Sequence, residues 1–358
     1  MKIALICPSN MLYMPYVKNY EQLLIEQNID YDIINWDRFQ MEEVDENTYR
    51  DEKKGHQRNF LDYIKYTKFL FNKLNVTHYD KIIVFGIQLS YFLKKLLLKN
   101  YKGNYVIDIR DYNKILHFFN IAELIRNASY TVLSSPGYQV WLPNRKKYLI
   151  NHNTHISNII ELKEIDPSFN KEKVSIANIG AIRDFSINQH FVDTLKNSGK
   201  FVLNYHGEGD YSFKLIKHLK NQHINNVFVT GRYKKEDEGN LYLRNDLINV
   251  LRYSNGINNK TALPNRLYNA MLYGKPLVAF NGTYLAKIIS KYNLGYVIQS
   301  MDNVENELNK YLNEFDRAAY EIGRTTYIRD VIKENNNFKK KIQEFIMAEV
   351  RIEKIITI

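Results

Sequence analysis

The stretch TALPNRLYNAMLYGKPLVAF, residues 261–280, contains a helix with a clear beginning and end, followed by a buried strand. Leu267–Tyr273 has a helical pattern, Gly274 is typical of the position after a helix, and the proline two residues later prevents the helix from resuming. The apolar run Leu277–Phe280 predicts a short buried strand. At the helix start, backbone N–H groups and the cation of Arg266 favour an anion. The stretch therefore predicts a phosphate cradle.

Length and composition indicate a two-domain globular chain. The sequence has 358 residues, 45% hydrophobic and 25% charged, which is an ordinary soluble composition. No apolar run approaches the ~20 residues of a membrane span, and the N-terminus opens into a strand rather than a signal peptide. The lone Cys7, interpreted as a core residue, excludes an internal disulfide and fits a reducing cytoplasm. The net charge of +11 predicts anionic partners.

Short strands alternate with helices in both halves, which predicts α/β domains with doubly wound parallel sheets. The first half has expected strands at Lys2–Cys7, Tyr31–Trp36, Lys81–Gly86, Tyr105–Arg110 and Tyr130–Ser135. The second half has them at Val174–Gly180, Phe201–Gly207, Val227–Gly231, Gly256–Asn258, Leu277–Phe280 and Tyr296–Gln299. Stretch 161–173 is charged and lacks an apolar period, so we interpret it as a linker. We predict domains over 1–165 and 166–335, and a helical tail over 336–358 that packs back on the first domain.

Metal and nucleophile signatures are absent from the sequence, which has no HExxH, CxxC or GxSxG motif. Asp30 and Asp32 form a DxD sequence, but it opens the second strand, and we interpret both as strand residues. His152 and His155 lack a third ligand nearby and are interpreted as hinge or interdomain residues. Neither a GxGxxG nor a Walker A loop is present, and the loop after the first strand has no glycine. A phosphate site is therefore expected in the second domain, without a metal.

Glycines stand where strands of the second domain end. Gly180, Gly207 and Gly231 follow its first three strands. Ligands of open α/β sheets bind beyond the carboxyl ends of strands, so these loops are expected to meet in one crevice. Arg183 and Arg266 are suited to hold a diphosphate there, because a guanidinium binds two phosphate oxygens in a fixed fork. The alternative is that both arginines are solvated loop charges.

Three stretches resemble the family 4-like glycosyltransferases of the GT-B fold. IGAIRD (179–184) is similar to the G-x-x-R turn that begins the donor domain, and LPNRLYNAMLYGKP (263–276) is similar to the LPNK…GKP donor signature. VIDIRDY (106–112) is similar to the D-x-R-D strand end that lines the acceptor side. The resemblance covers nearly the whole chain. It implies two Rossmann-like doubly wound domains facing a central cleft, a nucleotide-sugar substrate that is UDP-linked, and no metal or other cofactor.

The resemblance also implies roles for residues of the donor side. Arg183 and Arg266 would hold the diphosphate. Gly207 and Gly231 would let the backbone approach the donor, and Tyr233 would lie near the base. The remaining donor-binding residues would be Gly180, Thr261, Asn265 and Asn269.

Two positions depart from the family pattern, and the acceptor side leaves one question open. Asn269 stands where the family usually has a glutamate that binds the ribose hydroxyls, and 259–261 hold no second acid. On the acceptor side, Asp111 matches the acidic residue that contacts hydroxyls or acts as a base. Asp108 and Arg110 are two strand positions apart and share a face, as either a catalytic or a structural pair.

The function implied is transfer of a hexosyl group to a glycan or lipid-linked acceptor, in bacterial capsule, surface polysaccharide or glycoprotein glycan synthesis. Without a metal, arginines and a helix N-terminus would stabilise the leaving diphosphate. The alternatives are an inactive GT-B-like subunit that binds a partner enzyme and, less well supported by the residues present, a nucleotide-sugar epimerase. Dispersed basic residues without a recognition module argue against nucleic acid. A homo-oligomer is left open.

Basic and aromatic residues gather in two helical stretches of the first half. Segment 91–102 is one, and the helix expected at Phe60–Leu74 is the other. The second helix has Phe60, Ile64, Phe71 and Leu74 on one face and lysines at 65, 68 and 73. Such stretches suit peripheral contact with anionic lipid at the inner face of the membrane. The alternative is an ordinary amphipathic helix on the sheet, with lysines on its outer face.

Overall fold

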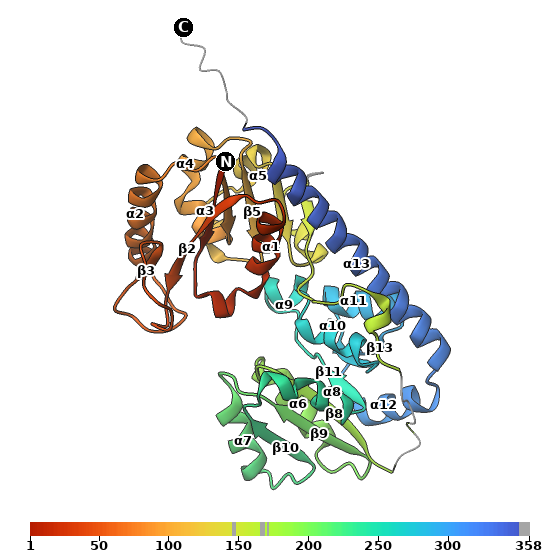
Figure 1. Cartoon of the computed structure of the whole chain (residues 1–358). Helices are drawn as coiled ribbons and strands as arrows, with labels where there is room; N and C mark the ends of the chain where they lie inside the picture. The colour runs from red at the N-terminus through yellow and green to blue at the C-terminus, as the bar shows by residue number, and fades with distance from the viewer. Residues whose placement is uncertain (145–147, 165–168, 170–171, 351–358) are drawn as a thin grey trace. The chain divides into compact units, whose positions relative to one another are not determined.

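The structure of the chain, a computed structural model, describes residues 1–144, 148–164, 169 and 172–350. Two compact units make up the chain (Figure 1). The first comprises Met1–His152 and the chain from Glu334 onward, and the second comprises Asn153–Lys333. The predicted boundary between 165 and 166 lies outside the described residues. The long helix α13 (Arg317–Met347) begins in the second unit and ends in the first.

The strands of the first unit form one parallel sheet in the order β3-β2-β1-β4-β5-β6-β7. They are β1 (Lys2–Cys7), β2 (Asp30–Asp37), β3 (Thr48–Arg50), β4 (Lys81–Phe85), β5 (Tyr105–Ile109), β6 (Tyr130–Leu133) and β7 (Tyr148–Ile150). Its other elements are η1 (Met11–Tyr13), η2 (Pro15–Val17), α1 (Lys18–Glu26), α2 (Phe60–Val76), α3 (Ile87–Phe92), α4 (Lys94–Asn100), η3 (Lys114–His117), α5 (Ala122–Asn127) and η4 (Pro136–Val140). Every residue of β4 and β5 is buried, as expected for parallel strands covered on both faces.

The second unit has a parallel sheet in the order β10-β9-β8-β11-β12-β13. Its strands are β8 (Val174–Ile179), β9 (Phe201–His206), β10 (Val227–Gly231), β11 (Leu247–Asn249), β12 (Leu277–Phe280) and β13 (Gly295–Ile298). Its other elements are η5 (Ile159–Glu161), α6 (Phe185–Leu195), α7 (Ser212–Asn221), η6 (Lys235–Asp237), α8 (Glu238–Leu243), α9 (Ile257–Thr261), α10 (Asn265–Leu272), α11 (Tyr284–Lys291) and α12 (Val304–Asn313). Strand order reverses between β8 and β11. The expected α/β class, with two parallel doubly wound sheets, is confirmed.

One predicted strand of the second unit is wrong. Gly256–Asn258 is not a strand, because Gly256 caps the N-terminus of α9. The fourth strand along the chain is the buried run Leu247–Asn249, nine residues earlier than the prediction. Ile257 is the one apolar side chain of the segment that was predicted, too few for a buried strand. The helix and strand predicted from 261–280 are confirmed as α10 and β12, with Gly274 at a φ of +63°.

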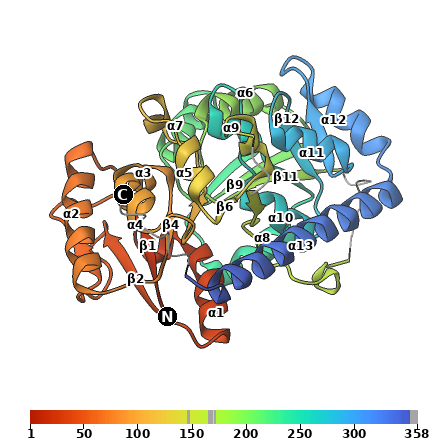
Figure 2. The same ribbon diagram turned by 90° about the horizontal axis from the view of Figure 1, so that it is seen from above.

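The buried face of α2 also differs from the predicted one. Phe60 and Ile64 are 55% and 45% exposed, whereas Tyr63 and Tyr66 are buried. The tyrosines tolerate burial because their hydroxyls find partners. Tyr66 donates to the carbonyl oxygen of Cys7 at 2.8 Å, and Tyr63 donates to Gln88 Oε1 at 2.8 Å. The apolar residues at the start of α2 therefore face outward, and α2 lies at the outer edge of the first unit in both ribbon views (Figures 1 and 2).

The end of α13 completes the core of the first unit. Its side chains Phe338, Ile342, Phe345 and Ile346 are buried in one cluster with residues of β1 and α1. Lys81, at the start of β4, donates from Nζ to the carbonyl oxygens of Phe345 at 2.6 Å and Ile346 at 3.0 Å. These carbonyls have no partner within the helix, so the ammonium group caps its C-terminus. Burial lowers the pKa of Lys81.

Asp37 is a buried carboxylate at the end of β2 that holds the following loop. It accepts hydrogen bonds from Met41 N at 3.0 Å, Asn10 Nδ2 at 2.5 Å and Arg50 Nε at 2.7 Å. Burial by itself would raise the pKa of Asp37, but these bonds lower it from 3.8 to about 2.

We expect Asp37→Asn to lower the free energy of unfolding near neutral pH by about 2 kcal/mol. Because the pKa is lower in the folded state than in the unfolded state, this contribution is complete above pH ~4 and is lost as the pH falls towards ~2. Urea unfolding of both proteins near neutral pH and at about pH 3 measures it. At the lower pH the difference should be about half as large. An unchanged difference would contradict the assignment.

Candidate active site

The candidate donor site lies in the second unit where the strand order reverses. β8 and β11 are neighbours there, with β9 and β10 on one side and β12 and β13 on the other. Connections after β8 and β11 leave in opposite directions, so a crevice opens beyond the carboxyl ends of these two strands. The loop 180–184 follows β8, and the segment that leads to α9 and α10 follows β11. Most of the predicted donor residues come from these loops and helices, and Gly207, Gly231 and Tyr233 come from the ends of β9 and β10.

Glycines join the loops after β8, β9 and β10. Gly180 N donates to the carbonyl oxygen of His206 at 2.9 Å, and Gly207 N donates to that of Gly231 at 2.8 Å. A Cβ atom at Gly207 would lie 2.3 Å from the carbonyl oxygen of Gly180. Glycine is therefore required at 207 by the close approach of the neighbouring loop. That Gly207 and Gly231 admit the backbone to a donor stays a prediction.

Arg266 is half-buried at the reversal point and is bonded to neutral oxygens. Its Nη1 donates to the carbonyl oxygen of Asn249 at 2.8 Å and to Oδ1 of Asn178. Asn178 and Asn249 lie at the ends of β8 and β11, so one guanidinium links both strands that flank the crevice. Among the described residues, no carboxylate forms an ion pair with Arg266. Burial lowers the pKa of Arg266, and the positive charge of Arg183 lowers it further.

Arg183 extends from a loop that is held on two sides. Asn188 of α6 donates from Nδ2 to the carbonyl oxygens of Arg183 at 2.9 Å and Asp184 at 3.1 Å. Asp184 has a left-handed backbone with a φ of +55°, and its Oδ1 accepts from Asn259 Nδ2 at 2.9 Å. The side chain of Arg183 is exposed. The positive charge of Arg183 acts on Arg266, and two such like charges favour a ligand with two negative charges.

Two buried polar atoms at this end of the sheet have no hydrogen-bond partner among the described residues. They are Nδ2 of Asn178 and Nε2 of His206. Burial lowers the pKa of His206, so its imidazole is neutral near pH 7. Native interiors rarely leave such groups unsatisfied, so a ligand or water group is expected here. Sequence reasoning missed both residues, and the one available signal is their position at the ends of predicted strands.

A carboxylate from α8 lies next to Asn269. Asn269 follows Arg266 by one turn of α10, and its Nδ2 donates to Glu238 Oε1 at 2.9 Å. The other oxygen of Glu238 pairs with the exposed Lys235. Burial, and then the charge of Glu238, raises the pKa of the half-buried Tyr233 to about 12. Sequence reasoning missed Glu238, because it is 31 positions from Asn269 and belongs to no motif.

The other two predicted donor residues have partners within the second unit. Thr261 is buried at the end of α9, and its Oγ1 donates to the carbonyl oxygen of Ile257 at 2.6 Å. Asn265 is exposed in the first turn of α10, and its Oδ1 accepts from Asn153 Nδ2 at 2.7 Å. The N-cap of α10 is Pro264, which has no side-chain acceptor for the N–H groups of the first turn.

In the first unit, Asp108 and Arg110 form a closed ion pair at the end of β5. Arg110 donates from Nε to Asp108 Oδ1 and from Nη2 to Oδ2, both at 2.6 Å. Tyr20 OH also donates to Oδ2, at 2.7 Å, and Asp108 is fully buried. Although burial alone would lower the pKa of Arg110, the charge of Asp108 raises it. Both carboxylate oxygens are used inside the protein, so the geometry suits a positioning pair.

The third predicted acceptor-side residue, Asp111, is exposed directly after this pair. The backbone between the two is held by side chains, because Tyr138 OH donates to the carbonyl oxygen of Arg110 at 2.5 Å. Arg110 Nη2 donates to Asn151 Oδ1 at 2.7 Å. Asp111 thus combines solvent access with a fixed backbone, as contact with a substrate requires.

The residues considered for a metal role are paired within the protein, and His152, interpreted as a hinge or interdomain residue, lies where the chain leaves the first unit. Asp32 accepts from Tyr79 OH at 2.5 Å and pairs with Lys2 at 3.0 Å. His152 is buried where the chain leaves the first unit, and its Nε2 lies 2.5 Å from Glu334 Oε2, where the chain returns. In the part of the chain that the structure describes, no group of three His, Cys, Asp or Glu side chains is arranged to hold a metal ion.

Comparison with known proteins gives one family match and several structural ones. Residues 187–321 match the family model described as glycosyl transferases group 1. The chain is similar to sucrose-phosphate synthase from Thermosynechococcus elongatus, with a TM-score of 0.71 and 12% identity over 98% of this chain and 100% of that one. It is similar to the lipopolysaccharide outer core galactosyltransferase WaaB in its apo form, with a TM-score of 0.65 and 15% identity over 97% of this chain and 99% of that one. It is also similar to Anabaena HepE in complex with UDP, with a TM-score of 0.64 and 14% identity over 96% of this chain and 100% of that one. No curated protein sequence matches the chain.

The similar solved structures confirm the predicted GT-B fold. The family match over residues 187–321 supports the prediction of a glycosyltransferase. The family match begins in α6 and ends in α13, so it includes Arg266 and Asn269 of α10. It is consistent with the family 4-like resemblance. The solved structures share little sequence with the chain, and their likeness concerns the fold.

The half-buried Arg110 and Arg266 should differ in how much stability is lost when their charge is removed. Arg110→Met leaves the buried Asp108 without a cationic partner, with only the hydrogen bond from Tyr20, so we expect a loss of about 3–5 kcal/mol in the free energy of unfolding. Arg266→Met leaves two neutral oxygens without a donor, and we expect a loss of no more than about 1–2 kcal/mol. Urea unfolding of both variants measures the difference. Equal losses would show that Arg266 is compensated as fully as Arg110.

Proposed function

We propose that this GT-B glycosyltransferase transfers a sugar from a nucleotide-diphosphate-sugar to a glycan or lipid-linked acceptor, without a metal ion. The observation that carries the proposal is Arg266, which links the ends of β8 and β11 through neutral oxygens and has Arg183 beside it. A diphosphate would supply the negative charge that these two guanidiniums favour. The UDP bound to Anabaena HepE supports a UDP-linked donor.

The proposed mechanism uses the second unit to stabilise the leaving group. As the bond between the sugar and the diphosphate breaks, negative charge develops on the phosphate oxygens. The guanidiniums of Arg183 and Arg266 and the uncapped N–H groups at the start of α10 stabilise that charge. Because the loop of Arg183 is bonded to Asn188 and Asn259, these donors need little rearrangement during the reaction.

We assign the ribose contact to Glu238, with Asn269 as its positioning residue. The Asn269 amide holds one oxygen of Glu238, and the other oxygen pairs with Lys235, an exposed partner that a ligand can replace. A carboxylate accepts hydrogen bonds from both hydroxyls of a ribose, which an amide cannot do as well. The alternative of an inactive GT-B-like subunit depended on the missing glutamate at 269. A carboxylate beside Asn269 favours the active enzyme.

On the acceptor side we propose Asp111 as the base that accepts the proton of the attacking hydroxyl. Its exposure suits this role, whereas the Asp108–Arg110 pair holds the strand end that carries it. The acceptor class that we propose is a glycan of a bacterial capsule, surface polysaccharide or glycoprotein. Synthesis would take place in the cytoplasm, at the inner face of the membrane.

We expect UDP to raise the melting temperature of the protein by the same amount with and without magnesium. GDP, CMP, TDP and ADP are measured in the same way for comparison. In Arg266→Met the dissociation constant for UDP should rise about 10–100-fold, the loss of a charge-assisted hydrogen bond. Isothermal titration calorimetry measures the constant. Stabilisation by UDP that requires magnesium, or an unchanged constant in the variant, would contradict the proposal.

Control ligands and variants separate the contacts of this site. Glu238→Gln should weaken binding of UDP more than binding of 2′-deoxy-UDP, because the deoxy ligand lacks one of the two ribose hydroxyls that Glu238 would contact. Arg232→Met is a matched control for Arg266→Met, since Arg232 is exposed in the same unit and pairs with Glu208 at the surface. It should bind UDP as the unchanged protein does.

Asp111→Asn is expected to lower turnover about 100-fold or more, the size of a lost general base, while UDP affinity stays the same. UDP-glucose turnover with a glycan acceptor measures the rate, and calorimetry measures the affinity. Glu43→Gln is the control, because Glu43 is another exposed carboxylate of the first unit. Equal rates in Asp111→Asn and the unchanged protein would remove Asp111 from the site.

A further inference from the structure

We infer that the first unit binds an anionic lipid surface through a cluster of exposed apolar side chains on its outer edge. This lipid-facing patch consists of Phe60, Leu61 and Ile64 of α2, Tyr91 of α3 and Phe118 after η3. Leu61 is 65% and Phe118 86% exposed, in addition to the exposed Phe60 and Ile64. The inference goes beyond the donor chemistry, because the patch contains none of the residues assigned to the transfer reaction.

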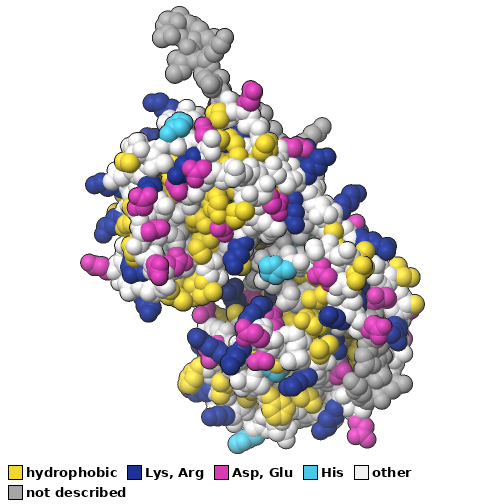
Figure 3. Space-filling model, in the orientation of Figure 1, with side chains coloured by type: hydrophobic (Ala, Val, Ile, Leu, Met, Phe, Trp, Pro, Cys, Tyr) yellow, Lys and Arg dark blue, Asp and Glu magenta, His cyan; other side chains and the backbone are white. Residues whose placement is uncertain are grey.

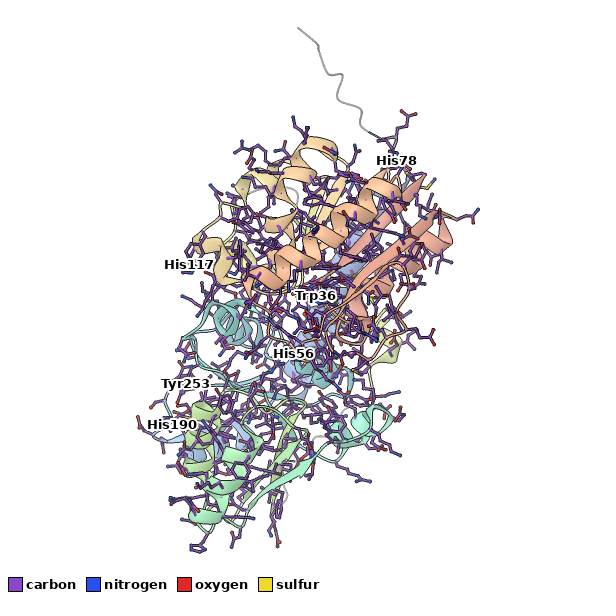
Figure 4. The ribbon with its side chains drawn as sticks, turned by 90° about the vertical axis from the view of Figure 1, so that its left-hand side faces the viewer. Trp36, His56, His78, His117, His190 and Tyr253 are labelled. Carbon is purple, nitrogen blue, oxygen red and sulfur yellow. The ribbon has the colours of Figure 1, made fainter. Side chains whose placement is uncertain are left out.

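Ring contacts join the members of the lipid-facing patch into one surface. The ring of Phe60 lies 6.4 Å from that of Tyr91 and 4.9 Å from that of Phe92. Tyr91 in turn lies 5.2 Å from Phe119, the neighbour of Phe118. In Figure 4, α2 crosses the front of the first unit, with His78 beyond its C-terminal end and His117 of η3 beside its N-terminal end. Ring contacts therefore run from the first turn of α2 through α3 to Phe119, next to the exposed Phe118.

Exposed lysines lie on the elements that carry the lipid-facing patch and on their neighbours, whereas the acidic residues of α2 and α5 are paired. Lys65 and Lys68 follow Leu61 and Ile64 by one helical turn on the same exposed face, and Lys95 of α4 and Lys114 of η3 are exposed as well. The acidic residue of α2, Asp62, is buried and pairs with Lys53 at 2.6 Å. Glu123 of α5 pairs with Lys94 at 2.7 Å. The charged side chains of α2, α4, α5 and η3 therefore carry a net positive charge.

This combination identifies the occupant as an anionic membrane surface. Aromatic and aliphatic side chains enter the boundary between headgroups and acyl chains, while lysine stems let the ammonium groups stay at the headgroups. Figure 3 shows hydrophobic, basic and acidic side chains interspersed on the face of the first unit that it presents. No helix in the described parts of the chain is long and apolar enough to cross a bilayer. The contact that we infer is peripheral.

The position of these apolar residues is otherwise hard to account for. The first turns of α2 could have carried polar residues outward, because Tyr63, Tyr66 and Leu70 already supply the face that packs inward. Soluble proteins seldom gather exposed aromatic and aliphatic side chains unless the surface binds something. Lys73, which the sequence grouped with the basic face, pairs with Glu46 at 2.9 Å and does not belong to the patch.

Sedimentation of the full chain with vesicles tests the inference. We expect binding to vesicles of phosphatidylcholine and phosphatidylglycerol in equal parts, and little binding to phosphatidylcholine alone. The double variant Leu61→Ser, Ile64→Ser should lower the partition coefficient about 10–100-fold, the effect of two lost apolar side chains. The double variant Lys65→Gln, Lys68→Gln should lower it about 10-fold or more on the anionic vesicles only. Salt should weaken binding in the same way as the lysine variant.

Matched controls exclude a general effect of exposed apolar residues. Ile25→Ser on α1 and Val76→Ser at the far end of α2 change side chains that are 64% and 86% exposed outside the patch. Both variants should bind vesicles as the unchanged protein does. The melting temperature with and without UDP shows whether each variant is folded and keeps its donor site. Failure of vesicle binding with an intact UDP response would overturn the lipid inference alone.

Two further outcomes would also overturn the inference. Equal binding to neutral and anionic vesicles would show that the lysines have no part in it. If the chain self-associates at micromolar concentration and Leu61→Ser, Ile64→Ser abolishes this association, then a second copy of the chain covers the patch. Sedimentation velocity without lipid distinguishes that case.

Discussion

The hydrogen bonds from Arg266 to Asn178 and Asn249 are the contact on which the donor side of this molecule depends. A single guanidinium joins the ends of β8 and β11, the strands between which the order of the sheet reverses. Because α10 carries that guanidinium, the same contact orients the helix start and places Asn269 beside Glu238. Strand ends, helix N-terminus and carboxylate are therefore positioned together by one side chain.

The half-buried residues Arg110 and Arg266 show how the surroundings of an arginine distinguish structural support from ligand binding. Arg110 has its charge matched by Asp108 and its remaining donors used by Asn151, so nothing about it calls for a ligand. Arg266 has neutral acceptors and feels the positive charge of a second guanidinium, so its own charge is not balanced by an ion pair within the described residues. The pKa of Arg110 is raised and that of Arg266 is lowered, so the surroundings stabilise the positive charge of Arg110 and destabilise that of Arg266. Excess positive charge is tolerated where a ligand is meant to bind.

The sequence predicted features that depend on neighbouring residues, and it missed those that depend on distant contacts. The helix before Gly274 and the strand after it have local causes, and so have the glycines at the strand ends. The predicted buried face of α2 was wrong, because a hydrophobic pattern does not indicate that the Tyr66 hydroxyl donates to the carbonyl oxygen of Cys7. Glu238 was missed for a similar reason, because only the packing of α8 against α10 brings it to Asn269. The strand at Leu247–Asn249 is three residues long, too short for a period to identify it.

The end of α13 has a consequence for the order in which the chain acquires its structure during synthesis. The core beneath β1 contains Phe338, Ile342 and Phe345, which the ribosome adds after every residue of the second unit. The second unit is one uninterrupted segment and can fold as soon as it has emerged. Domains usually fold in the order of synthesis, starting from the N-terminus. Here the unit that contains the N-terminus is the last to be completed, and until then the apolar face of its first strand stays exposed to chaperones and to other nascent chains.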